Sequence, residues 1–181
     1  EVTLHVGAGT FKPMVADDIS EHEMHHELIE MSLSALSNLA TSSREVIAVG
    51  TTSMRTLESL YWLGMKAIHD ASVLDNPVVN QWDPYEFSHP SLPWREVYSK
   101  LGSMMETKGL QTIRLRTGLI IIPGYQIQVA RTLITNFHMP SSTLLLLVAA
   151  LVGEDWKRLY NHALNNDYRF LSFGDSSILS A

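Results

Sequence analysis

The stretch from Leu133 to Thr143 constrains the fold more than any other part of this 181-residue sequence. A β-branched apolar run leads into it, Asn136 and His138 follow, and a run of leucines begins after Ser142. This order predicts a buried strand, a tight turn and a helix that opens on a hydroxyl residue. Ligands of open α/β sheets bind outside the carboxyl ends of such strands. We therefore expect Asn136 and His138 at a ligand site, beside the unpaired N–H groups of the helix start.

A second stretch repeats this order. Residues 45–50 predict a short strand that is buried on both faces, as in parallel sheets, and a helix follows over about 54–63. The three residues between them, 51–53, all carry hydroxyl groups, whereas ordinary N-capping needs one. Because Arg55 and Glu58 lie on the first turns of this helix, we expect them near the same ligand site.

The remaining sequence alternates strands with helices, which predicts a three-layer α/β sandwich with a mixed, mostly parallel sheet. A capping box at Ser20 and an apolar stripe at three- and four-residue spacing predict a helix that begins at Ser20 and ends among residues 40–43. We expect residues 1–181 to form a single domain, with a proline- and aromatic-rich excursion at 70–109 that is a lid or an insertion. Further strands are predicted at 2–6, 113–116, 119–122 and 168–173, further helices at about 94–107 and 154–165 and directly after Thr143, and a glycine turn at 7–11.

Composition and charge narrow the classes of function. The absence of cysteine excludes disulfides and thiolate metal sites and fits a cytoplasmic location, and the longest apolar run, 144–152, is about half of a membrane span, so we expect no membrane partner. Residues 1–109 carry 7 Lys/Arg and 15 Asp/Glu, whereas residues 110–181 carry 6 and 4. An anionic partner is therefore expected to contact the second part of the chain.

One short motif suggests a different chemistry. Residues 22–26 fit the HExxH pattern, in which two histidines on one face of a helix bind zinc and the glutamate acts as general base. Five residues match often by chance in a chain with eight histidines. A zinc hydrolase therefore stays open as an alternative, with His22 and His26 as ligands and Glu23 as base.

Six blocks of sequence, taken together and in order, are far more specific than this motif: residues 4–11, 21–27, 49–58, 123–125, 133–144 and 168–175. They resemble the S-adenosylmethionine:tRNA ribosyltransferase-isomerase family of queuosine biosynthesis, in its C-terminal portion. The family's N-terminal part and small β-barrel domain have no counterpart here, so we expect a fragment of a longer enzyme.

The resemblance implies a reaction. Such enzymes transfer the ribosyl part of S-adenosylmethionine, a co-substrate, to an aminomethyl-deazaguanine base at the wobble position of tRNA. The ribose is isomerised, adenine and methionine leave, and epoxyqueuosine results. The implied partners are S-adenosylmethionine and the tRNA anticodon region; no metal is expected, and we expect a monomer.

The resemblance also implies roles for individual residues. The chemistry needs a base for the carbon next to the sulfonium, and the matching positions offer four candidates. Arginines suit the methionine carboxylate, hydroxyl and amide groups suit the ribose, and carboxylates suit the aminomethyl group. The candidate catalytic residues are His138, His22, His25 and His5; the candidate substrate-binding residues are Gly7, Gly9, Thr10, Phe11, Glu27, Thr51, Thr52, Ser53, Arg55, Glu58, Thr135, Asn136, Phe137, Arg169, Ser172, Gly174 and Asp175.

One departure from the family keeps a further alternative open. Arg131 stands where the family commonly has Asp. A divergent module that binds a nucleotide or RNA without transferring ribose is therefore the second alternative.

Overall fold

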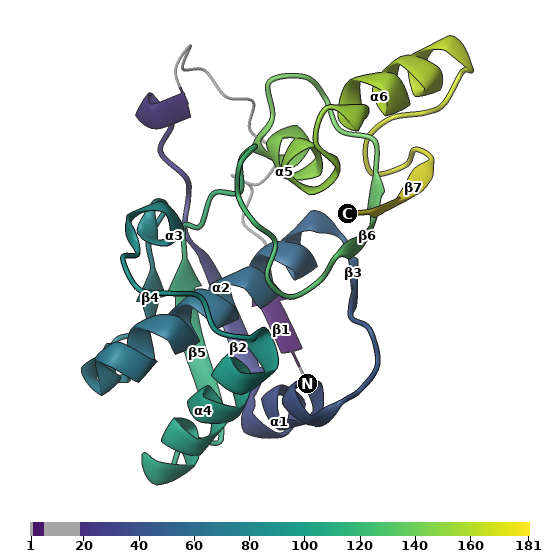
Figure 1. The fold of residues 1–181 in the computed structure, drawn as a ribbon. Helices are drawn as coiled ribbons and strands as arrows, with labels where there is room; N and C mark the ends of the chain where they lie inside the picture. The colour runs from purple at the N-terminus through teal and green to yellow at the C-terminus, as the bar shows by residue number, and fades with distance from the viewer. Residues whose placement is uncertain (1, 6–18) are drawn as a thin grey trace.

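The strands form two separate sheets in the computed structural model, which describes residues 2–5 and 19–181 (Figure 1). The α/β class and the mixed pairing are confirmed, but the pairing is not mostly parallel: β3 with β6 and β4 with β5 are parallel, and three pairs are antiparallel. The first sheet has the order β1 (Val2–His5), β2 (Glu27–Ser32), β5 (Thr112–Thr117), β4 (Val78–Val79), and the second has the order β3 (Ile47–Val49), β6 (Thr132–Asn136), β7 (Ser176–Ser180).

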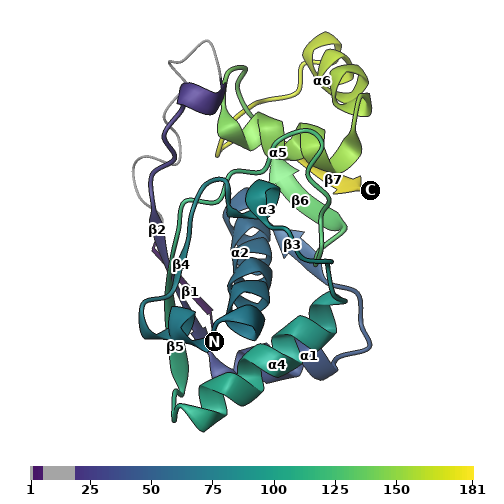
Figure 2. The same cartoon turned by 60° about the vertical axis from the view of Figure 1, so that its left-hand side comes forward.

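Helix α2 (Thr51–His69) lies between the two sheets (Figure 2). Helices α1 and α4 pack against each other at one end of the molecule, and α5 and α6 lie at the other end, next to β6 and β7. No helix in the described ranges is both long and apolar enough to cross a bilayer. The other helices are α1 (Leu33–Thr41), α3 (Asp83–Glu86), α4 (Trp94–Thr107), α5 (Thr143–Val152) and α6 (Asp155–Asn165), with short 3-10 turns at Ile19–Glu21 and Ala71–Asp75.

The core forms where α2 faces the first sheet. Strand β5 alternates exposed and buried residues, as its sequence predicts, and its inward side chains Ile113 and Leu115 pack with Ile29 and Met31 of β2. Burial of each such side chain contributes roughly 1.5–3 kcal/mol of hydrophobic stabilisation. This core fixes α2, whose first turn carries the hydroxyl residues of the predicted site.

The helix predicted from residue 20 to residues 40–43 is wrong in its first half, whereas its end is confirmed. Residues 22–26 form neither helix nor strand, and β2 follows. The helix begins only at Leu33, after Ser32 accepts a hydrogen bond from the Ala35 N–H at 3.2 Å, and it ends at Thr41. The apolar stripe therefore spans an irregular segment, a strand and a helix. Pairing of β2 with both β1 and β5 outweighs the local helical pattern.

Three strand predictions also need correction. Residues 119–122 are largely buried but join neither sheet: the Leu119 N–H donates to Thr117 Oγ1 and the Ile122 N–H to Tyr85 Oη instead. Residues 168–173 form a loop, and the last strand is β7. Strand β3 is buried on one face only, since Ile47 and Val49 are exposed.

The segment 70–109 adds a short strand to the edge of the first sheet. Its short strand β4 pairs with β5 at the edge of that sheet, and Lys66 of α2 bonds Asp83 at 2.6 Å and the Val78 carbonyl at 3.0 Å. Helix α4 occupies the predicted residues and packs on α1 and α2. None of the described residues of this segment lines the cleft described below.

Candidate functional site

A cleft of about 570 Å³ opens where the predicted strand–turn–helix stretches meet. It lies beyond the carboxyl ends of the parallel strands β3 and β6, at the starts of α2 and α5. The predicted segments 50–53 and 135–138 both contribute to its wall, and Ser172 joins them from the loop before β7. The glycine turn, with Gly7, Gly9, Thr10 and Phe11, lies outside the described residues. The cleft is lined by Val49, Gly50, Thr51, Thr52, Ser53, Thr135, Asn136, His138, Met139, Pro140, Ser142, Leu144, Leu171 and Ser172.

Gly50 sets the start of α2 at the edge of the cleft. Its φ of +88° is in the region that glycine alone adopts without strain, and its N–H donates to the Ile134 carbonyl of β6 at 2.8 Å. No side chain caps this helix start, whereas Ser142 caps α5 by accepting from the Leu145 N–H at 3.2 Å. The first N–H groups of α2 therefore remain available for a ligand, and the helix dipole favours a negative one.

His138 is the predicted base that lines the cleft. Its side chain is buried, Nε2 lies 2.9 Å from Thr135 Oγ1, and its backbone N–H donates to Tyr160 Oη at 3.0 Å. Burial lowers the pKa of His138 from 6.5 to about 4, because the protein interior disfavours the charged imidazolium. The imidazole is therefore neutral near pH 7 and held in one orientation.

The other three histidine candidates lie elsewhere in the described structure. His5 is exposed on β1, 4.0 Å from Glu30, and His25 Nε2 lies 3.3 Å from Glu27 Oε1. The carbonyl of His22 accepts a hydrogen bond from Gln81 Nε2 at 2.7 Å. Because 22–26 is not helical, the face that HExxH requires is not formed, and no three His, Asp or Glu side chains within the described ranges could share a metal ion.

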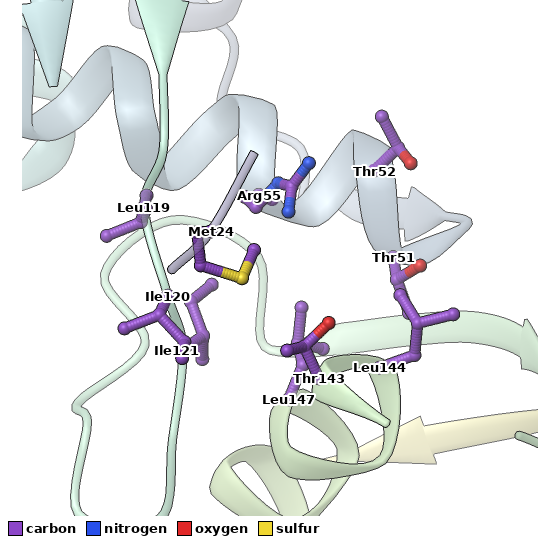
Figure 3. A pocket seen from close by; sticks show the side chains of 10 residues that line it. All are labelled: Met24, Thr51, Thr52, Arg55, Leu119, Ile120, Ile121, Thr143, Leu144 and Leu147. Carbon is purple, nitrogen blue, oxygen red and sulfur yellow. The ribbon is translucent and has the colours of Figure 1, made fainter. Parts of the chain in front are cut away.

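Arg55 and Glu27 form a buried ion pair behind the cleft. Arg55 Nη2 contacts Glu27 Oε2, and the two residues are 6% and 3% exposed, so each charge compensates the other. Arg55 Nε has no hydrogen-bond partner among the described residues. It borders a void of about 10 Å³ between α2 and α5, which adjoins the cleft through Thr51 and Thr52 (Figure 3). A void of this size accommodates one water molecule, so Arg55 lies behind the wall of the cleft rather than in it.

Glu58 and Phe137 prove to be core residues. The Glu58 carboxylate accepts hydrogen bonds from Tyr125 Oη at 2.7 Å and from the N–H groups of Gln128 and Val129 at 3.0 and 2.8 Å. Burial raises the pKa of Glu58, and these hydrogen bonds oppose the rise. Phe137 packs in an aromatic cluster, with its ring centre 5.5 Å from that of Tyr160. In the described structure the side chains of Glu58 and Phe137 are enclosed by the protein and do not line the cleft.

The loop 168–175 holds Ser172 in the cleft. The Asp175 carboxylate accepts from the Arg169 N–H at 2.7 Å, which lowers the pKa of Asp175, and Asn136 Nδ2 donates to the carbonyls of Gly174 and Asp175 at 3.3 Å. A side chain at Gly174 would lie 2.3 Å from the Arg169 carbonyl, so only glycine fits there. In the described structure, Arg169, Gly174 and Asp175 thus shape the loop instead of lining the cleft.

An apolar part of the cleft wall was not predicted from the sequence. Val49, Met139 and Leu171 line the cleft and are 65%, 50% and 52% exposed. Met139 lies in the turn of the central stretch, so its position alone could have indicated it. Leu171 carried no such signal, because its segment has the composition of a strand.

The fold and the cleft are those of an α/β protein with a candidate ligand site between the ends of two parallel strands and the starts of two helices. Residues 1–179 match the model of a family described as "Queuosine biosynthesis protein", and the chain belongs to this family, as its motifs predict.

Two relatives of the chain share the same name. The S-adenosylmethionine:tRNA ribosyltransferase-isomerases of Cereibacter sphaeroides and Aromatoleum aromaticum are 38% and 36% identical over 183 residues, which cover 99% of this chain. The chain spans 40% of the length of these curated relatives. The crystal structure of an S-adenosylmethionine tRNA ribosyltransferase from Thermotoga maritima is similar with a TM-score of 0.56 and 26% identity, over 98% of this chain and 43% of that one.

Proposed function

We propose that the protein transfers and isomerises the ribosyl part of S-adenosylmethionine onto the aminomethyl-deazaguanine base at the wobble position of tRNA. The product is epoxyqueuosine, and adenine and methionine leave. The observation that carries the proposal is the agreement between the relatives' name, at 36–38% identity over 99% of the chain, and the cleft beside His138. The tRNA substrate implies a cytoplasmic location, and we propose that residues 1–181 act as one α/β domain of a monomeric enzyme.

The cleft has the groups that S-adenosylmethionine needs. Its volume of about 570 Å³ is in the range of small-molecule sites. We place the methionine carboxylate at the uncapped start of α2, because free N–H groups and the helix dipole favour an anion there. The hydroxyls of Thr51, Thr52 and Ser53 are available for the ribose, and the apolar wall with Met139 and Leu171 suits adenine.

His138 is the candidate for the base that removes the proton next to the sulfonium. With a pKa of about 4 its imidazole is neutral at pH 7, so a ring nitrogen has a free lone pair. The same low pKa makes it a weak base, so proton removal relies on the acidity that the sulfonium gives the neighbouring carbon. The contact of Nε2 with Thr135 Oγ1 at 2.9 Å fixes the ring, which is the condition for aiming the other nitrogen.

The test uses the complete gene product with S-adenosylmethionine and tRNA that carries the aminomethyl-deazaguanine base. We expect adenine release together with the mass gain of the transferred ribosyl group on the tRNA. His138→Ala should keep its thermal melting temperature but lose at least 100-fold in turnover, the order of magnitude that general base catalysis contributes. His69→Ala is the matched control, because this exposed histidine lies at the opposite end of α2, about 27 Å from the cleft at 1.5 Å per residue.

The wild-type assay tests the reaction, and the His138→Ala assay tests the role of His138 in it. Binding of S-adenosylmethionine without adenine release by the wild type would instead support a non-catalytic nucleotide- or RNA-binding module. Full turnover in His138→Ala would remove His138 as the base but leave the reaction in place.

A further inference from the structure

Phe173 holds its ring in solvent beside the cleft. It is 97% exposed, the largest exposed fraction among the large apolar side chains of the described residues. Its neighbours in sequence, Leu171 and Ser172, both line the cleft, whereas Phe173 does not. An apolar ring in water contributes nothing to hydrophobic stabilisation, so folding of the described part of the chain does not explain its position.

The backbone around Phe173 is fixed in place. The Gly174 N–H donates to the Leu171 carbonyl at 2.9 Å, which closes a turn with Ser172 and Phe173 at its tip. The Leu171 N–H donates in turn to the Phe137 carbonyl at 2.9 Å, and the backbone of Leu171 is left-handed with φ +69°. This conformation costs free energy for a residue with a side chain, and such strain concentrates at ligand sites.

The geometry points to a stacking platform for an unpaired base, and we propose that Phe173 stacks on a base of the tRNA anticodon loop next to the cleft. The inference rests on the proposed function, in which the small substrate occupies the cleft and the RNA approaches its mouth. Phe173 stands outside the cleft wall, so its partner must extend beyond a small molecule held in the cleft. Unpaired bases of RNA are held by stacking on aromatic side chains, which are available only when they are exposed.

The surroundings of the ring favour a nucleic acid over an apolar protein partner. The Arg169 side chain is 75% exposed at the base of the same loop, 3.5 Å from Asp175, and can reach a phosphate. The cleft wall that Leu171 lines is also apolar at Met139, and both residues are half exposed. Residues 110–181 carry two more basic than acidic residues, in contrast to the acidic first part of the chain.

The test compares Phe173→Ala with Phe173→Tyr in the complete gene product. Both variants are assayed for the KM of tRNA at saturating S-adenosylmethionine, for the KM of S-adenosylmethionine, and for melting temperature. We expect Phe173→Ala to raise the KM of tRNA roughly 10- to 100-fold, the loss that follows removal of one base-stacking ring, with the KM of S-adenosylmethionine unchanged. Phe173→Tyr keeps the ring and should stay near wild type. Leu164→Ala, at an equally apolar and 65% exposed residue of α6, is the control and should change nothing.

A second measurement observes the stack directly. An anticodon stem-loop with 2-aminopurine next to the wobble position should lose fluorescence on binding wild type and Phe173→Tyr but not Phe173→Ala. An unchanged KM of tRNA and equal quenching in Phe173→Ala would overturn the inference. So would a lower melting temperature with both KM values unchanged, because the ring would then be covered by another part of the protein. Either result leaves wild-type adenine release, and with it the proposed function, intact.

Discussion

Lowering the pH should destabilise the protein through His138 by an amount that the structure predicts. In the folded state burial holds the pKa of His138 at about 4, whereas in the unfolded chain it returns to about 6.5. Between these values the unfolded state binds the proton and the folded state does not, so stability falls as the pH falls. This difference in pKa lowers the free energy of unfolding by about 3 kcal/mol in total, with about 2 kcal/mol lost between pH 7 and pH 5 and a further 1 kcal/mol by pH 4.

Urea unfolding at a series of pH values measures this loss, and His138→Gln isolates it. Glutamine cannot take up the proton, so the difference in unfolding free energy between wild type and variant should shrink by about 2 kcal/mol from pH 7 to pH 5. Other titrating groups are common to both proteins and cancel. A difference that stays flat over this range, or an imidazole that titrates near 6.5 by NMR, would show that the ring is solvated and would refute the reasoning.

Two further predictions concern the buried carboxylates. Glu58→Ala should lower the unfolding free energy by about 3 kcal/mol, because it leaves the Tyr125 hydroxyl and two backbone N–H groups without their acceptor; Glu58→Gln keeps one acceptor and should lose less in the same urea assay. Glu27→Gln should lower the free energy of unfolding by about 3–5 kcal/mol, because the Arg55 charge stays buried without its partner. Adding Arg55→Met should recover most of that loss. If the double variant is no more stable than the single one, the two charges are not coupled.

The sequence predicts the place of the cleft well, because that place depends on local patterns. It predicts the path of several segments poorly, because their structure depends on contacts with distant parts of the chain. The two strand–turn–helix stretches are local patterns, and each forms a strand followed by a helix, although β3 is buried on one face only and α2 is longer than predicted. Whether residues 27–32 become strand or helix depends on pairing with β1 and with β5, which is about 80 residues away in sequence. Residues 168–173 have strand composition, but Leu171 turns the backbone, and Phe170 packs on Phe137 instead of extending a sheet.

The residues that the motifs predict for the candidate site fall into two groups in the structure: those that line the cleft and those that support its wall. Motif resemblance marks Arg55, Glu58 and Asp175 together with the cleft residues, because a family motif does not distinguish a ligand contact from the support beneath it. Only the structure separates them. The Glu58 carboxylate accepts hydrogen bonds from the backbone N–H groups of residues 128 and 129, and the Asp175 carboxylate accepts one from the backbone N–H of Arg169. The three charges therefore act on the shape of the site, through the segments they hold.

The two helix starts then decide how a ligand lies between them. Both meet the cleft, but α5 begins with the Ser142 side chain bonded to its Leu145 N–H, whereas α2 begins at Gly50 with no side chain that can cap it. The cap therefore takes up one N–H group of α5 that has no counterpart bond at α2, and the part of the wall next to α5 is supplied by Met139, Pro140 and Leu144. A ligand with one anionic end and one apolar end fits this asymmetry in a single direction, with the anion at α2. S-adenosylmethionine, with a carboxylate at one end and adenine at the other, has that polarity.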